Sequence, residues 1–146
     1  MRLTRRTDRG GRRGASATEL AVILPVLTMM ALGCVDFGRF AYHYIAVQNA
    51  ARAGAEYAIT TPYTTTGKAA WKAQIELTAK AELDGQTGLV SGAVEVKVPD
   101  PAVDSSTGLR QVRVVVTYKG FETLVSWPGI PDDPELAAAV EMRAIR

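Results

Sequence analysis

The most prominent feature of the hydrophobic pattern is an uncharged run from Leu20 to Val35. As a helix, this run would cover about 24 Å at 1.5 Å per residue, slightly less than the ~30 Å hydrocarbon core of a bilayer. If Asp36 and Arg39 pair one turn apart, the embedded part would extend to about Tyr44. The pattern therefore predicts a membrane-spanning segment over about residues 20–44. The alternative interpretation is a buried core helix of a soluble protein.

Small residues continue the helical pattern after this run. Four of them recur at every fourth position: Ala46, Ala50, Gly54 and Ala58. Such a stripe lets helix backbones approach each other closely, although any alanine-rich helix of high propensity would look the same. No helix breaker appears before Thr60-Thr61-Pro62, so we expect a long helix within residues 15–58, regular from about Ala17. Its C-terminal half must rest on a domain or on other helices.

Pro25 interrupts the backbone hydrogen bonding of the apolar run. It removes the bond to the carbonyl of Ala21, so we expect a kink there, which membrane helices tolerate.

The pattern beyond the long helix predicts an α+β domain over residues 59–146. Lys68 to Leu83 is expected to form a second helix, with a modest apolar stripe. The stripe consists of Trp71, Ile75 and Ala79, with Leu77 and Leu83 beside them. The period then changes to two in Val94–Val98 and Val112–Tyr118, which predicts antiparallel strands. Leu136 to Ile145 fits a helix or a strand, and we favour a strand. The predicted fold is a short antiparallel sheet covered by helices.

Charge is distributed unevenly and predicts the orientation in the membrane. Residues 1–14 hold six arginines and one aspartate, whereas the whole chain has a formal charge of +2, so the remainder is acidic. Positive charge beside an apolar span stays on the cytoplasmic side. We therefore expect a basic cytoplasmic leader and a periplasmic C-terminal domain. A nucleic-acid-binding interpretation of these arginines lacks the aromatic residues that usually accompany them.

The chain offers little catalytic or metal-binding chemistry. His43 is the only histidine and Cys34 the only cysteine, and both fall on the predicted long helix. The acid pairs in loops, such as Asp100 and Asp104 or Asp132 and Asp133, lack the spacing of a calcium loop. We expect no catalytic residue, no cofactor, no metal and no small-molecule substrate.

Three export signals compete at the N-terminus. Ala31-Leu32-Gly33 is a weak site for an ordinary cleaved signal peptide. Gly33-Cys34 after an apolar run suggests a lipoprotein, although a small apolar helix residue is the simpler interpretation of the cysteine. The third is prepilin-type processing between Gly14 and Ala15, with Glu19 at the edge of the membrane helix.

Three stretches of the sequence carry a family resemblance. They are residues 13–27 (RGASATELAVILPVL), 35–39 (VDFGR) and 49–55 (NAARAGA). Together they resemble the TadE-like pseudopilins of the tight-adherence (Flp/Tad) pilus, over residues 12 to 58. The resemblance implies a non-enzymatic minor pilin of the bacterial inner membrane that takes part in pilus assembly. It also implies three partners: a prepilin peptidase, the inner-membrane platform and other pilin-like subunits.

Glu19 has two physical interpretations. A carboxylate drawn toward the bilayer centre costs about 2.5–3.5 kcal/mol and needs a partner. After cleavage behind Gly14, the new amine of Ala15 could pair with Glu19 of a neighbouring subunit. Alternatively, Ser16 to Glu19 fits a capping box. We favour the pairing role. The rival interpretation of the whole chain is a membrane-anchored envelope protein, or a lipoprotein, whose exported domain binds a ligand or the cell wall.

Overall fold

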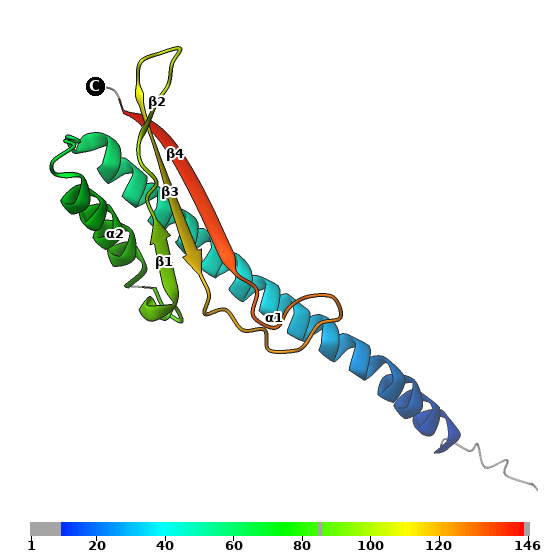
Figure 1. Cartoon of the computed structure of the whole chain (residues 1–146). Helices are drawn as coiled ribbons and strands as arrows, with labels where there is room; N and C mark the ends of the chain where they lie inside the picture. The colour runs from blue at the N-terminus through cyan, green and yellow to red at the C-terminus, as the bar shows by residue number, and fades with distance from the viewer. Residues whose placement is uncertain (1–9, 85, 145–146) are drawn as a thin grey trace, which may run out of the picture.

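A single long helix dominates the molecule (Figure 1). The computed structural model of the protein describes residues 10–84 and 86–144. Helix α1 runs from Gly10 to Thr60, and its 51 residues span about 76 Å at 1.5 Å per residue. Its N-terminal half projects beyond the other elements, whereas its C-terminal half carries them. The leader arginines before Gly10 and the predicted strand end at Ile145 lie outside the described residues.

Helix α1 begins at Gly10, earlier than the predicted Ala17. The unpaired N–H groups of its first turn therefore belong to residues well before Ser16. The capping-box interpretation of Ser16 to Glu19 is wrong for this form of the chain, because these residues lie inside the helix. The Thr18 hydroxyl instead donates backward along the helix to the carbonyl of Ala15, at 2.8 Å. The helix also continues through Pro25.

Helix α2 extends from Lys68 to Asp84, as the pattern predicted to within one residue. The buried residues on it are Trp71, Ile75, Ala79 and Leu83. This spacing of four places them on one face of the helix. Leu77 was expected beside this stripe, but it is 59% exposed because it projects from another face.

Four strands follow a short 3₁₀ turn at Ser91–Ala93. The strands are β1 (Val94–Lys97), β2 (Ala102–Val103), β3 (Arg110–Tyr118) and β4 (Leu136–Ala144). The predicted α+β class is confirmed, and so is a strand rather than a helix after Leu136. Strand β2 was not predicted, because two residues are too few to display an alternating pattern.

Strand β3 is the middle strand of the antiparallel sheet. It pairs with β4 along its whole length, from Arg110 opposite Ala144 to Tyr118 opposite Leu136. On its other side, β1 pairs with one end of β3 and β2 with the other end. The strand therefore fixes the register of every other strand.

Helices α1 and α2 cover one face of the sheet, so the domain has two layers. Alternation along β3 directs Val112, Val114 and Val116 into the core between the layers, and all three are fully buried. Arg113, which alternates with them, is exposed. The apolar core thus holds the sheet against the C-terminal half of α1.

Arg110 connects the start of β3 with the end of α1. Its Nη2 donates to the carbonyl oxygens of Ala58 at 3.2 Å and Thr61 at 3.4 Å. Its guanidinium also lies over the rings of Tyr63 and Trp71. The last carbonyls of a helix lack partners within the helix, so Arg110 caps the C-terminus of α1.

Candidate functional site

The N-terminal half of α1 is an uncovered apolar rod. Every residue from Gly14 to Ala31 is exposed, including the large side chains of Val22 and Met30. A stretch of 18 residues in this helix has a mean hydropathy of 2.2, and only 6% of the stretch is buried. Its length and composition suffice to cross a membrane. An apolar surface of this extent is stable only against lipid or other proteins.

The predicted processing and pairing residues lie on this rod. Gly14, Ala15 and Glu19 are all exposed on α1. Ala15 and Glu19 are four residues apart, so they share one face of the helix. Pro25 follows on the same exposed segment. These residues are therefore accessible to a membrane enzyme or a neighbouring subunit.

The small-residue stripe lies elsewhere, inside the domain. Ala46 is 3% exposed and Ala50 is fully buried. A Cβ on Gly54 would lie 3.3 Å from Cβ of Ala79 and 3.3 Å from Cγ1 of Val114. Gly54 thus lets α1 approach α2 and β3 closely. The structure shows this stripe packing within the chain, so we do not propose it as a contact between subunits.

A loop from the C-terminal part of the chain closes onto α1 where the apolar rod ends. The loop comprises residues 119–135, between β3 and β4. The carboxylate of Asp36 holds it in place. Asp36 accepts a hydrogen bond from the backbone N–H of Leu124 at 2.9 Å and another from Nε1 of Trp127 at 3.0 Å. Arg39 is also 3.5 Å from Asp36, which confirms the predicted pair within the helix.

The indole of Trp127 lies along α1 beside Gly33. A Cβ at Gly33 would come within 3.2 Å of Cη2 of this ring, so any other residue would push the indole by a few tenths of an ångström. The edge of Phe121 meets Phe40 of α1, with centroids 5.7 Å apart and an interplanar angle of 87°. Aromatic packing therefore adds to the hydrogen bonds of Asp36.

The tip of the loop is a tight turn. Ile130 N–H donates to the carbonyl of Trp127 at 3.1 Å, and Gly129 has a φ of 83°. Pro128 and Gly129 at the two central positions are the residues that a type II turn favours. Farther back, Thr123 N–H donates to the carbonyl of Asp132 at 3.1 Å, which closes the base of the tip.

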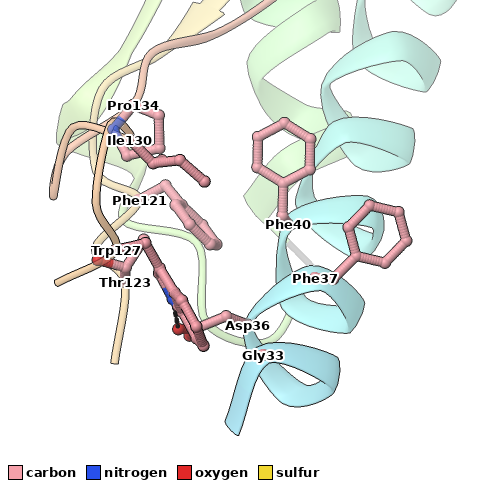
Figure 2. Close-up of a pocket in the computed structure, with 9 residues that line it drawn as sticks. All are labelled: Gly33, Asp36, Phe37, Phe40, Phe121, Thr123, Trp127, Ile130 and Pro134. Atoms are coloured by element: carbon pink, nitrogen blue, oxygen red, sulfur yellow. Dashed lines mark hydrogen bonds between the residues drawn. The ribbon is translucent and has the colours of Figure 1, made fainter. Parts of the chain in front are cut away.

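The loop and α1 enclose an apolar groove of about 400 Å³ (Figure 2). Phe37 and Phe40 contribute from α1, while Phe121, Trp127 and Ile130 contribute from the loop. Figure 2 shows the indole pointing toward Gly33 and Asp36, at the end of the groove nearest the apolar rod. We use the name boundary groove for this space.

Sequence reasoning missed the link between Asp36 and Trp127. The two residues are 91 positions apart, and the local pattern suggested only the Arg39 partner. Two signals were nevertheless present. A carboxylate next to an apolar run needs several donors, and a tryptophan before Pro-Gly has an indole N–H that needs an acceptor.

The described residues form no group of three or more metal-ligating side chains. The loop acids have other partners. Lys68 and Lys72 of α2 both bind Asp100, and these hydrogen bonds lower the pKa of its carboxyl to about 2. Hydrogen bonds from Ser106 likewise lower the pKa of Asp104 to about 2. Both carboxylates support the domain's own loops.

The two residues with nucleophile or base chemistry line the same pocket of α1 but differ in exposure. His43 is 6% exposed and packs against the rings of Phe121 and Tyr118. Cys34 is a free, exposed cysteine on the far end of the apolar segment. The His43 imidazole thus packs among aromatic rings.

An apolar helical rod that is long enough to cross a membrane and carries a small α+β domain on its other half indicates a membrane-anchored protein. Comparison with protein families then gives a more specific result: residues 14–56 match the family described as TadE-like protein. The resemblance noted in the sequence is therefore confirmed for this N-terminal segment, which is similar to that of the TadE-like proteins associated with tight-adherence (Flp/Tad) pili. Comparisons with curated proteins and with solved structures gave no match.

Proposed function

We propose that the chain is a minor pilin, or pseudopilin, that takes part in assembly of a tight-adherence pilus. The observation that carries this proposal is the position of the family match. It begins at Gly14 and covers the uncovered apolar half of α1 together with the segment that packs on the domain. A subunit of this shape can hold its domain outside a membrane and pass its apolar rod to other subunits.

In this proposal the chain crosses the inner membrane once, with the leader in the cytoplasm and the domain on the other side. The basic leader supports this orientation. The segment from Gly14 to Gly33, exposed as far as Ala31, would span about 30 Å, the thickness of the hydrocarbon core. The docking of the 119–135 loop at Asp36 supports a span that ends near Gly33, shorter than the segment 20–44 predicted from the sequence.

Processing by a prepilin peptidase would occur between Gly14 and Ala15. Removal of residues 1–14 makes Ala15 the first residue of the helix, so the carboxylate of Glu19 then lies one turn from a free amine. The amine of one subunit pairs with Glu19 of its neighbour, which removes both charges from lipid. In the processed chain, a capping role of Glu19 becomes available again, and an experiment must separate the two roles.

The proposed role is structural and non-enzymatic. Its partners are the peptidase, the inner-membrane platform and other pilin-like subunits. The domain supports such a role because its conspicuous side chains are engaged in packing. His43 lies among aromatic rings, and Arg110 caps the end of α1.

Glu19→Gln tests the proposal, because it keeps the size and hydrogen-bonding capacity of the side chain but removes its charge. We expect normal removal of residues 1–14, normal membrane insertion and a clear loss of cross-linking to pilin-like subunits. Glu56→Gln is the matched control, since Glu56 is exposed on the same helix but beside the domain. Its cross-linking should equal that of the wild type. Full assembly of Glu19→Gln would leave only the capping role.

A further inference from the structure

We propose that the tip of the 119–135 loop lies in the interfacial layer of the bilayer and binds lipid there through the boundary groove. This inference rests on the membrane anchoring proposed above. It adds a second membrane contact, made by the exported domain rather than by the spanning helix. The occupant of the groove is a lipid acyl chain, with its headgroup at the level of Arg39.

The uncharged character of the loop tip is the first argument. The hydrogen bond between Thr123 and Asp132 closes the tip, and the eight residues between them, LVSWPGIP, contain no charge. Leu124 and Ile130 are each 55% exposed, although the domain's interior lies close by. A loop facing only water would not be expected to present two such side chains beside a partly buried tryptophan.

The position of the tip along α1 is the second argument. The loop runs beside α1 toward its apolar half (Figure 1), and Trp127 reaches Gly33. Counted from Gly14, this point lies about 30 Å along the helix, where the hydrocarbon core of a bilayer ends. The boundary groove is therefore continuous with the surface that lipid covers, and Phe37, 72% exposed, extends that surface past Gly33.

The chemistry around the groove matches the interfacial layer. Tryptophan is enriched at this depth, where its ring is apolar and its N–H needs a polar partner. Asp36 supplies that partner, and its charge is offset by the Leu124 N–H and by Arg39. The Arg39 side chain is 40% exposed, so it can also reach a lipid phosphate. Among the described residues that line the groove, Asp36 is the only carboxylate, and its charge is thus offset by groups of the protein.

Tryptophan fluorescence of the full chain in phosphatidylcholine vesicles tests this inference. The chain has two tryptophans, and Trp71 is only 5% exposed within the domain core. Lipids brominated near the carbonyl end of their acyl chains should quench part of the wild-type emission. Lipids brominated near the middle of the chains should quench less. Trp127→Phe leaves Trp71 alone, and its emission should be insensitive to both lipids.

A second variant separates failure of this inference from failure of the anchoring. Leu24→Trp, made in the Trp127→Phe chain, places an indole in the middle of the apolar rod and should be quenched most by the deep bromines. If it is quenched while wild-type emission is insensitive to both lipids, the anchoring stands and the lipid contact of the loop is wrong. If Leu24→Trp is not quenched either, the anchoring fails and this inference fails with it.

Protein density in the vesicles distinguishes lipid from a second copy of the chain. Quenching of Trp127 by the shallow bromines should be the same at one chain per vesicle and at high density. Loss of this quenching as the density rises would show that a neighbouring subunit takes the groove in preference to lipid, which would overturn the proposal.

Discussion

Asp36 is the residue on which the junction between rod and domain depends most. Its carboxylate is almost buried and accepts hydrogen bonds from the loop backbone and from the Trp127 indole, while Arg39 balances its charge. Hydrogen bonds to a charged acceptor are stronger than neutral ones, and a buried donor left without a partner is costly. One side chain therefore holds a seventeen-residue loop against a helix that is distant in sequence.

Asp36→Asn should loosen this loop. The amide keeps the shape but places an N–H₂ group either against Nε1 of Trp127 or against the Leu124 N–H and Arg39, so at least one donor loses its acceptor. We expect the domain to lose about 1–3 kcal/mol of stability, measured by denaturant unfolding in detergent. Hydrogen exchange at the Leu124 amide should accelerate as well.

Asp133→Asn provides the control for this prediction, because Asp133 is an exposed carboxylate of the same loop. Its unfolding midpoint should stay at the wild-type value. Equal midpoints for Asp36→Asn and Asp133→Asn would contradict the role assigned to Asp36.

At the scale of elements, close packing of α1 against α2 and the sheet defines the domain. The small residues of α1 permit this approach, and a Cβ at Gly54 would lie 3.3 Å from side-chain atoms of both α2 and β3. Any larger side chain there meets Ala79, Val114 and Ile75 at once. Overpacking of this kind typically costs about 1–3 kcal/mol.

Gly54→Leu should therefore lower the unfolding temperature of the domain. Gly38→Leu, on the same helix, is the matched control, because nothing lies within 4 Å of a Cβ at Gly38. Leucine also has the higher helix propensity, so Gly38→Leu should unfold at the wild-type temperature or above it. If both variants unfold at the same temperature, Gly54 is not a packing point.

The elements were predictable where periodicity was strong. The stripe of Trp71, Ile75 and Ala79 predicted α2, and the alternating valines of β3 predicted a half-buried strand. The sequence of β4 fitted both a helix and a strand. Its buried ends at Leu136, Ala138 and Ala144 are separated by even intervals, as a strand requires.

Other features depended on tertiary structure and could not be predicted from the local sequence. Helix α1 begins at Gly10, so the sequence from Ser16 to Glu19 lies inside the helix and does not mark its start, although it fits a capping box. The small-residue stripe predicted a close approach of backbones but not which element would approach. The contact between Asp36 and Trp127 arises only when β4 and β3 bring the loop back to α1.

The whole molecule is a rod with one bare end and one covered end. The domain covers one face of α1 from Asp36 onward, and the segment before Gly33 is left for lipid or for other subunits. Both the family match and the exposed apolar surface include this bare end. The proposed assembly role depends on how that end is processed, because cleavage behind Gly14 creates the amine that Glu19 is proposed to bind.

The most direct test is therefore the identity of the N-terminal residue of the protein isolated from membranes of cells that also express the peptidase. We predict Ala15, obtained by N-terminal sequencing or by mass spectrometry of the intact chain. Met1 would indicate an uncleaved anchor, and a lipid-modified Cys34 would indicate a lipoprotein. Either of these two results would contradict the proposed pilin function.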